Sequence, residues 1–284
     1  MKRILLTGAN GFIGKNIKAL LGQQFELVEV SRNSRYDILH LDSLMQINNI
    51  DIVIHCAAKT FVPDSFSDPY SFYDFNIKCT LNIAEYCRIK SVSKVIYLNS
   101  YPYGNPEYLP INETHPIHFH SHYNKSKQLC EDLLFYYLEN VTNVVSLRLF
   151  NIFGQYQSDN FLIPTVLNQI LHSSSVKVKD LQPKRDYLYI KDLIFLLEKI
   201  LIDTQSHGIF NVGSGKSVSV GEIIELIAKI VNKKIEVVSE NYTRENEVMD
   251  CIADIQKVKN AFNWAPQFSL ENGLMDYIIG VNHV

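Results

Sequence analysis

The chain has 284 residues, of which 46% are hydrophobic and 20% charged, enough to bury the core of one large domain or of two unequal ones. A formal net charge of −3 gives no electrostatic reason to expect binding to nucleic acid or to an anionic membrane. No apolar run approaches the roughly 18–20 residues of a membrane span and the first residues lack a signal-peptide pattern, so we expect a soluble, cytoplasmic protein.

Short apolar runs alternate with amphipathic segments through the first half of the chain. The pattern predicts strands over residues 3–7, 26–30, 52–56, 94–98 and 144–149, and helices near 11–21, 72–89 and 123–138. Apolar strands of this length that alternate with helices are typical of a parallel sheet covered on both faces. With right-handed crossovers, the prediction is an α/β fold with a Rossmann-type doubly wound parallel sheet.

The pattern loosens after Gly154. It predicts a strand near 176–179 and helices near 163–171, 192–201 and 269–279. Ser219 and Glu222 have the spacing of a capping box, and apolar residues recur at helical spacing behind them. We find no internal repeat and no flexible linker, so we expect this half to pack on the first.

A glycine-rich turn follows the first predicted strand and begins the first helix, with the sequence Thr7-Gly8-Ala9-Asn10-Gly11-Phe12-Ile13-Gly14. Glycines at a spacing of three allow a tight turn, close approach of the backbone to a pyrophosphate, and close contact between helix and strand. The helix N-terminus adds free N–H groups and a positive dipole end. Between a strand and a helix, this motif predicts a dinucleotide site.

The second predicted strand ends in Glu29-Val30-Ser31-Arg32. In dinucleotide-binding folds an acid at this place usually holds the ribose 2′-OH. Ser31 and Arg32 instead suit a 2′-phosphate, because a guanidinium binds phosphate well. We therefore favour NADP(H) as cofactor. NAD(H) is the alternative, because a shift of one residue in register would bring Glu29 toward the ribose.

Tyr123 and Lys127 lie four residues apart in a predicted helix and therefore share one face. A phenol has a pKa near 10, and a neighbouring ammonium favours the phenolate and lowers that pKa toward the working range. The pair follows a strand that ends in Asn99-Ser100. The pattern predicts Tyr123 as a catalytic acid/base and Lys127 as its partner, which could also hold the nicotinamide ribose.

With these motifs in this order, the sequence resembles the extended short-chain dehydrogenase/reductases, the NAD(P)-dependent nucleotide-sugar epimerase/dehydratase/reductase family. The resemblance runs nearly from end to end. Its further matching segments are His55-Cys56-Ala57-Ala58, Ser65 through Asn76, Tyr103-Gly104, Arg148-Leu149-Phe150-Asn151, Lys184-Arg185-Asp186-Tyr187, Asn211 through Gly215, and Trp264-Ala265-Pro266.

The resemblance, together with the glycine turn and the end of the second strand, implies roles for individual residues. Those expected to hold the dinucleotide, with Asp42 and Ser43 at the adenine, are Gly8, Asn10, Gly11, Phe12, Ile13, Gly14, Ser31, Arg32, Asp42, Ser43, Cys56, Ala57, Ala58, Lys59, Asn76, Tyr123, Lys127 and Phe150. Those expected to hold the nucleotide-diphosphate sugar are Lys59, Asn151, Arg185 and Arg244.

The active-site turn departs from the family pattern. The family places Ser or Thr five residues before the glycine of its V-Y-G turn, and counting back from Gly104 this position is Asn99, with Ser100 next to it. Either the turn is one residue shorter and Ser100 acts in catalysis, or Asn99 binds the sugar oxygen through its amide. An amide can donate to that oxygen but cannot relay a proton as a hydroxyl can, so we favour Ser100.

Two reactions fit this family and these residues. A 4-ketoreductase of a nucleotide sugar would use exchangeable NADPH, which Ser31 and Arg32 favour. A 4-epimerase would keep NAD tightly bound, and residues 59–76 resemble epimerases. A 4,6-dehydratase is not expected, because residues 99–104 lack the acid pair for elimination. A non-catalytic dinucleotide-binding protein of the same fold is the remaining alternative.

The resemblance also predicts how the chain is organised. We expect an NAD(P)-binding domain with the catalytic pair over residues 1–154, and a nucleotide-sugar-binding lobe over 155–284, with parts near 180–215 returning to the sheet. We also expect a homodimer, formed by the helices of Tyr123 and of Asn76. No metal site is expected, because the five cysteines form no C-x-x-C pair and the histidines near Tyr123, at 115, 118, 120 and 122, have no carboxylate or cysteine beside them.

Overall fold

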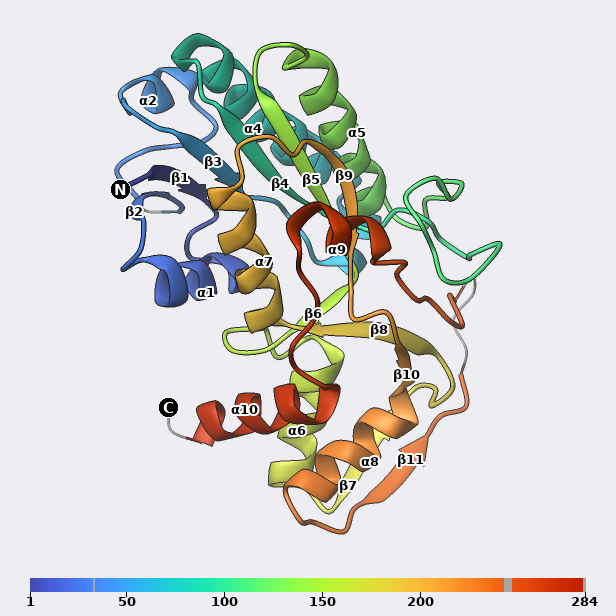
Figure 1. The fold of residues 1–284 in the computed structure, drawn as a ribbon. Helices are drawn as coiled ribbons and strands as arrows, with labels where there is room; N and C mark the ends of the chain where they lie inside the picture. Colours follow the sequence, from blue (N-terminus) through green and yellow to red (C-terminus); the bar gives the residue numbers. More distant parts are fainter. Residues whose placement is uncertain (33, 243–246, 283–284) are drawn as a thin grey trace.

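The computed structural model describes residues 1–32, 34–242 and 247–282. Its main sheet has six strands in the order β2-β1-β3-β4-β5-β9, and every neighbouring pair is parallel (Figure 1). The strands are β1 (Arg3–Thr7), β2 (Glu26–Val30), β3 (Ile52–His55), β4 (Lys94–Ser100), β5 (Asn143–Leu149) and β9 (Gly208–Val212). The predicted Rossmann-type doubly wound sheet is confirmed, and β9 is a strand that the sequence pattern did not reveal.

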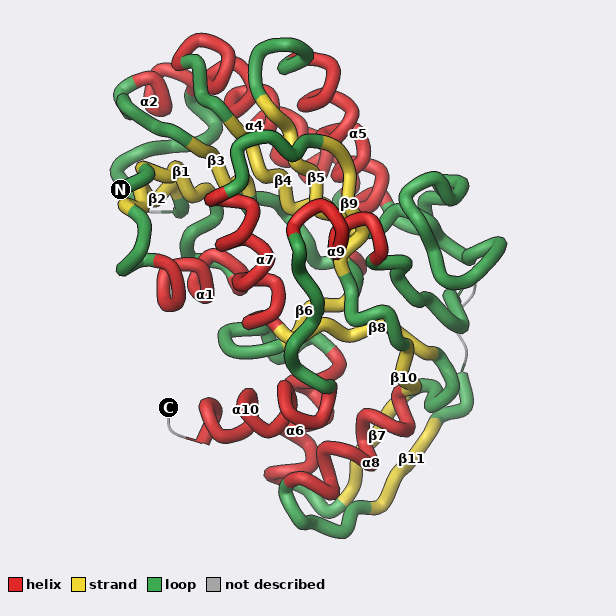
Figure 2. The backbone as a smooth tube through the Cα atoms, in the orientation of Figure 1, coloured by secondary structure: helices red, strands yellow, loops and turns green. Residues whose placement is uncertain are grey.

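Two apolar cores form on opposite faces of this sheet, because alternate residues of each buried strand point to opposite sides. Leu6 and Ile54 belong to one core, and Leu5 and Val53 to the other. The first core includes residues of α1 (Phe12–Leu21) and α7 (Ile190–Ile202), and the second includes residues of α2 (Leu41–Met45), α4 (Pro69–Lys90) and α5 (His122–Tyr137). Figure 2 shows the sheet between these helices.

The second half of the chain builds smaller sheets next to the main one. A three-stranded sheet has the order β10-β8-β6, and a two-stranded sheet pairs β11 with β7. Their strands are β6 (Asn151–Phe153), β7 (Ser175–Val178), β8 (Lys184–Tyr189), β10 (Ser217–Ser219) and β11 (Glu236–Ser239). Of the segment expected to return to the main sheet, β9 does so and α7 covers it, whereas β8 joins the three-stranded sheet.

The remaining helices are α3 (Val62–Ser67), α6 (Leu162–His172), α8 (Val220–Ile230), α9 (Gln256–Phe262) and α10 (Leu270–Asn282). The predicted capping box starts α8: the Ser219 hydroxyl accepts from the Glu222 N–H at 3.1 Å, and the Glu222 carboxylate accepts from the Ser219 N–H at 2.8 Å. None of the helices, as far as the chain is described, is long and apolar enough to cross a membrane.

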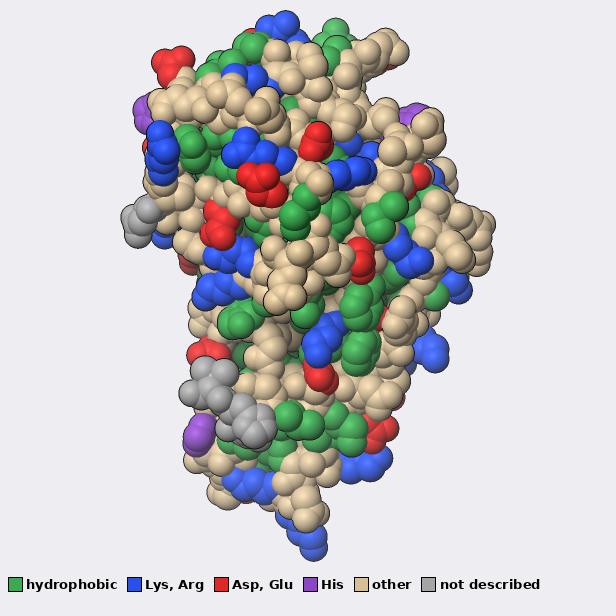
Figure 3. Space-filling model, turned by 60° about the vertical axis from the view of Figure 1, so that its left-hand side comes forward, with side chains coloured by type: hydrophobic (Ala, Val, Ile, Leu, Met, Phe, Trp, Pro, Cys, Tyr) green, Lys and Arg blue, Asp and Glu red, His purple; other side chains and the backbone are tan. Residues whose placement is uncertain are grey.

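The order of the strands determines where a ligand can bind. The chain leaves β1 through α1 to reach β2 on one side, and later enters β3 on the other side of β1. In open α/β sheets, the carboxyl ends of the strands at such a reversal form a crevice. On the face drawn in Figure 3, basic and acidic side chains are interspersed, so this face offers no extended basic surface.

Candidate active site

A cleft of about 2510 Å³ opens at the carboxyl ends of the main strands and extends to the smaller sheets. Its lining includes the glycine turn, the ends of β2, β4 and β5, the segment after β3 and the start of α5. From the second half of the chain, residues of β6, β7 and β8 complete the lining. The cleft therefore brings together segments that are far apart in the sequence.

The glycine turn at one end of the cleft has the shape that a phosphate group requires. Gly8 has φ +69°, in the left-handed region, and its N–H donates to the carbonyl of Val30 at 2.8 Å. A Cβ at Gly8 would lie 2.8 Å from the backbone nitrogen of Ala57, and a Cβ at Gly14 would overlap the carbonyl oxygen of Gly8. Gly11 caps α1 without a side chain, so the first-turn N–H groups can bind an anion. The residues present fit a dinucleotide pyrophosphate.

A buried histidine holds the segment after β3 against this turn. The Thr7 hydroxyl accepts from the N–H groups of Cys56 and Ala57, both at 3.1 Å, and lies 2.7 Å from His55 Nδ1. Burial and the charge of Lys127 lower the pKa of His55 to about 3, so the imidazole is neutral. Thr7 then donates to Nδ1, and His55 Nε2–H donates to Thr80 Oγ1 at 3.0 Å. This role of His55 was not predicted, although the polar residue within an apolar strand is a signal for it.

Residues at the end of β2 bear on the two cofactor alternatives. Glu29 forms an ion pair with Lys18 at 2.9 Å, and it does not line the cleft. Ser31 and Arg32 do line the cleft, and Asn10 Nδ2 donates to Ser31 Oγ at 2.8 Å. The glycine turn is thereby tied to the place where the ribose of a bound dinucleotide is expected.

Asp42 and Ser43, the residues expected at the adenine, lie beside the cleft rather than in its lining. Both lie in α2, outside the lining of the cleft, and Ser43 Oγ accepts from the N–H of Asp37 at 2.9 Å. Asp37, Ile38 and Leu39 line the cleft instead. The turn before α2 brings this earlier segment to the cleft, which the sequence spacing did not reveal.

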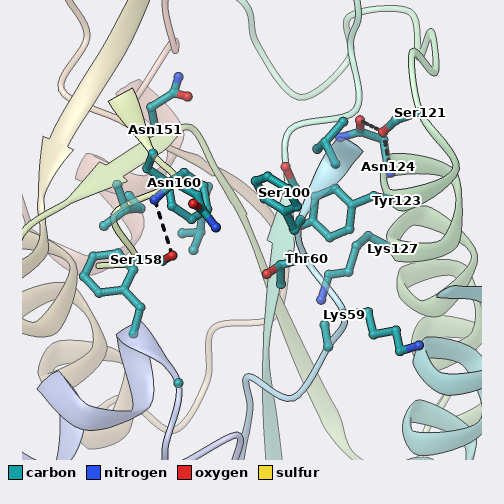
Figure 4. Close-up of a pocket in the computed structure, with 18 of the residues that line it drawn as sticks. Lys59, Thr60, Ser100, Ser121, Tyr123, Asn124, Lys127, Asn151, Ser158 and Asn160 are labelled. Carbon is teal, nitrogen blue, oxygen red and sulfur yellow. Dashed lines mark hydrogen bonds between the residues drawn. The ribbon is translucent and has the colours of Figure 1, made fainter. Parts of the chain in front are cut away.

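Tyr123 and Lys127 both line the cleft from α5, whose N-terminus is capped by Ser121 (Figure 4). The phenol of Tyr123 lies beside Ser100 in the cleft. Burial raises the pKa of the Tyr123 phenol to about 12, and Ser100 offsets this only in part. The lowering by Lys127 that we expected does not occur, and the phenol is protonated at neutral pH.

The ammonium of Lys127 is buried beneath Tyr123. The side chain of Lys127 is about 3% exposed, and burial lowers its pKa. Its Nζ lies 4.1 Å from the ring centroid of Tyr97, a cation–π contact. A buried cation with this environment favours an anion or several hydroxyl groups as a further partner, as ribose hydroxyls would provide.

Asn99 and Ser100, the two candidates at the end of β4, point to different surroundings. Asn99 is 3% exposed, its Nδ2 donates to Glu131 Oε2 at 2.8 Å, and its Oδ1 accepts from the N–H of Ser100 at 2.8 Å. The amide is therefore occupied inside the protein, while the Ser100 hydroxyl lies at Tyr123. This arrangement favours Ser100 as the residue that meets a substrate oxygen.

Two predicted residues act on the loop after β3. Lys59 lines the cleft, and its N–H donates to Asn76 Oδ1 at 2.8 Å. Asn76 is buried outside the lining, and its Nδ2 donates to Ser126 Oγ at 2.9 Å. Asn76 therefore links the Lys59 loop to α5.

The opposite side of the cleft carries Asn151, one of the residues predicted for the substrate (Figure 4). Phe150 stacks on Tyr101 with ring centroids 4.7 Å apart. Within the described ranges, the buried Nδ2 of Asn151 has no hydrogen-bond partner, so it can donate to a ligand. Arg185 lines the cleft and forms an ion pair with Glu247. Arg244 lies outside the described residues.

The histidines before α5 have separate surroundings. His115 is buried, and its Nε2 accepts from the N–H of Glu107 at 2.9 Å. His118, His120 and His122 line the cleft, and His122 Nδ1 lies 3.1 Å from the hydroxyl of Tyr73. In the part of the chain that the structure describes, no three His, Cys, Asp or Glu side chains gather as they would around a metal ion.

This chain is similar to known proteins in both sequence and structure. A model of the NAD dependent epimerase/dehydratase family matches residues 4–213. A GDP-6-deoxy-D-mannose reductase of Pseudomonas aeruginosa is 29% identical over 96% of this chain and 95% of its own, and a UDP-glucose 4-epimerase of Bacillus subtilis is 28% identical over 96% and 95%. The solved structure of RMD from Pseudomonas aeruginosa complexed with NADPH has a TM-score of 0.91 at 29% identity, with 98% of both chains covered.

Proposed function

The chain belongs to the NAD-dependent epimerase/dehydratase family, as its resemblance to the extended short-chain dehydrogenase/reductases implied, and from this premise we propose that it is an NADPH-dependent 4-ketoreductase of a nucleotide-diphosphate sugar. The observation that carries the proposal lies at the end of β2. Glu29 is paired with Lys18 and is absent from the cleft lining, while Ser31 and Arg32 line it. A hydroxyl beside a guanidinium suits the 2′-phosphate that distinguishes NADPH from NADH.

The protonation state of Tyr123 supports the same direction of reaction. A phenol with a pKa raised to about 12 holds its proton at neutral pH and can give it to a ketone oxygen. The relatives support the substrate class, since they include a GDP-6-deoxy-D-mannose reductase and a UDP-glucose 4-epimerase.

Different residues of the cleft have different roles in the proposed reaction. The bound dinucleotide supplies the hydride that carbon C4 of the sugar receives. Tyr123 donates its proton to the C4 oxygen, and Ser100 holds that oxygen by a hydrogen bond beside Tyr123. The glycine turn binds the pyrophosphate through backbone N–H groups, and Lys127 binds the ribose next to the reacting carbon. The product is a C4 alcohol, and Tyr123 regains its proton from solvent.

The substrate binds across the cleft in this proposal. Asn151 donates its free Nδ2 to a diphosphate oxygen, and Lys59 and Arg185 provide positive charge. Arg185 exchanges its ion pair with Glu247 for the diphosphate when the substrate enters.

Residues 1–154 form the dinucleotide domain and residues 155–284 the substrate lobe. Five free cysteines fit a reducing compartment such as the cytoplasm.

We include a homodimer in the proposal. α4 and α5 pack against each other, and each carries large apolar side chains on its exposed surface. These side chains are Tyr70, Leu81 and Ile89 on α4, and Leu129 and Tyr136 on α5. A second copy that covers this surface would remove it from water. Size-exclusion chromatography coupled to light scattering tests the homodimer, and a monomer at micromolar concentration would contradict it.

The alternative is a nucleotide-sugar 4-epimerase with tightly bound NAD. The UDP-glucose 4-epimerase of Bacillus subtilis matches this chain nearly as well as the reductase does, at 28% against 29% identity. The experiment that separates the two has two parts. The dinucleotide that accompanies the purified protein is identified, and NADPH oxidation is then followed with GDP-linked and UDP-linked 4-keto sugars, with Tyr123→Phe as control. Tightly bound NAD would contradict the proposal, and NADPH oxidation that requires both keto sugar and Tyr123 is the expected result.

A further inference from the structure

Glu131 lies on the same face of α5 as the two residues proposed for catalysis. Tyr123, Lys127 and Glu131 are spaced four residues apart, which places them on successive turns of one side of the helix. Glu131 is 1% exposed, and the reaction proposed above gives it no role. We propose that Glu131 is a positioning residue for that reaction, which holds Ser100 in place through Asn99. The inference rests on the proposed function for its kinetic consequence, and on contacts within the protein for the rest.

The end of strand β4 has no neighbouring strand on its β3 side, so the backbone N–H of Ser100 needs another hydrogen-bond acceptor there. β3 pairs with β4 only up to Tyr97, and successive N–H groups of a strand point to opposite sides. The N–H of Tyr101 donates toward β5, to the carbonyl of Leu149 at 3.2 Å. The N–H of Ser100 therefore faces the side where β3 has already ended, and there it donates to Asn99 Oδ1 at 2.8 Å. Without this acceptor, the half-buried N–H would lose its partner within the protein.

Glu131 determines which way the amide of Asn99 points. Asn99 Nδ2 donates to Glu131 Oε2 at 2.8 Å. A carboxylate only accepts hydrogen bonds, so the NH₂ end of the amide must face Glu131 and the oxygen must face Ser100. With the amide turned over, two oxygens would meet at Glu131 and two donors would meet at Ser100. The charge of Glu131 therefore selects the one orientation that holds the Ser100 backbone.

The carboxylate of Glu131 is itself held by strand β5 and by its own helix. Arg148 Nη2 donates to Glu131 Oε1 at 2.6 Å. Ser146 Oγ donates to Glu131 Oε2 at 2.5 Å, and Gln128 Nε2 donates to Glu131 Oε1 at 2.9 Å. Burial acts to raise the pKa of Glu131, but the hydrogen bonds and the charge of Arg148 outweigh it and lower the pKa, so the carboxylate is charged at neutral pH. This cluster ties α5, which carries Tyr123, to the end of β4, which carries Ser100.

Hydrogen exchange of the Ser100 amide tests the positioning without any substrate. In Glu131→Gln we expect this amide, in a peptide covering residues 98–103, to exchange at least about ten times faster than in the wild type, because its acceptor is no longer fixed. The matched control is Ser146→Ala, which removes a donor to the same Glu131 oxygen but leaves the contact with Asn99. It should leave the exchange of Ser100 unchanged. If the Ser100 amide of Glu131→Gln exchanged at the same rate as in the wild type, the proposal would be overturned.

The kinetic arm uses NADPH and a 4-keto nucleotide sugar. A misplacement of about 1 Å can cost about a hundredfold in rate, so we expect kcat of Glu131→Gln to fall roughly 10- to 100-fold, with KM and the NADPH Kd within about threefold of wild type. In an Asn99→Ala background, Glu131→Gln should add no further loss, because Glu131 acts through Asn99. Additive losses would overturn that route. If no keto sugar is reduced at all, the proposed function fails, while the exchange result still decides the positioning.

A second variant covers the case in which Glu131→Gln does not fold. Removing one partner of a buried ion pair is strongly destabilising, whereas removing both charges is often tolerated. Glu131→Gln combined with Arg148→Met should therefore regain a melting temperature close to that of the wild type. We expect it to keep the fast exchange of Ser100 and the low kcat. Recovery of wild-type exchange and kcat would mean that Glu131 only balances the charge of Arg148, and would overturn the proposal.

Discussion

The close approach of the glycine turn to the segment after β3 can be tested by one methyl group. Gly8 has φ +69°, and a Cβ there would lie 2.8 Å from the nitrogen of Ala57 and 2.9 Å from the carbonyl carbon of Cys56. Gly215 has a similar φ of +78°, but its Cβ would meet nothing closer than the Ile255 side chain, at an ordinary 3.5 Å. Gly8→Ala and Gly215→Ala therefore share the backbone strain and differ in the steric overlap.

The two substitutions lead to different expected losses of stability. Placing alanine in the left-handed region costs about 1–2 kcal/mol in both variants. In Gly8→Ala the overlap with backbone atoms, which cannot rotate away, adds about 1–3 kcal/mol. With about 2–4 °C of melting temperature per kcal/mol for a chain of this size, we expect a fall of roughly 10 °C for Gly8→Ala and roughly 4 °C for Gly215→Ala.

The assay combines thermal unfolding with a fluorescence titration of NADPH. A shifted glycine turn misplaces the N–H groups that face the pyrophosphate, so the Kd of Gly8→Ala for NADPH should rise at least about tenfold, a loss of about 1.4 kcal/mol. Gly215 does not line the cleft, and its variant should bind NADPH like the wild type. Equal losses of stability in the two variants, with unchanged NADPH affinity in Gly8→Ala, would refute the reasoning.

Three further outcomes follow from the site. Tyr123→Phe should lower kcat by about 10²–10⁴-fold with an unchanged NADPH Kd, as stopped-flow and titration can measure, and full activity would exclude the proposed proton donor. Arg32→Ser should weaken NADPH by roughly 10- to 100-fold and leave NADH unchanged in the same titration; equal effects on both would exclude a 2′-phosphate contact. The folded-state pKa of His55, about 3, is below the value of 6.5 in the unfolded chain, so its contribution to stability is present above pH 6.5 and is lost as the pH falls toward 3. Urea unfolding at pH 7.5 and pH 5 should show the wild type losing about 2 kcal/mol more than His55→Asn, and an equal loss in both would contradict a buried neutral imidazole.

The main sheet could be predicted because its strands are short, apolar and bounded by clear turns. Each of the five predicted strands is present, and the glycine turn joins β1 to α1 as expected. The smaller sheets were harder to predict, because β6 and β10 have three residues each and β8 begins with three consecutive charged residues, Lys184-Arg185-Asp186. Such strands depend on partners that are distant in sequence, and a local pattern cannot show those partners.

Parts of the site depended on contacts that the sequence does not display. The choice between Asn99 and Ser100 turns on Glu131, which lies 32 positions after Asn99 and orients its amide. The family resemblance suggested Asp42 at the adenine, whereas the turn before α2 brings Asp37 to the lining of the cleft. One signal was available and unused: Glu131 continues the four-residue spacing of Tyr123 and Lys127.

The central claim is that NADPH delivers its hydride to C4 of a nucleotide-bound keto sugar while Tyr123 supplies the proton. The most direct measurement uses NADPH carrying deuterium at the transferred position, with GDP-linked and UDP-linked 4-keto sugars, and locates the label by mass spectrometry and NMR. The account expects one deuterium at C4 of the sugar alcohol, formed in equal amount to the NADP produced, and no product with Tyr123→Phe. No deuterium in the sugar, together with protein that retains NAD and inverts C4 of a 4-hydroxy nucleotide sugar, would contradict it.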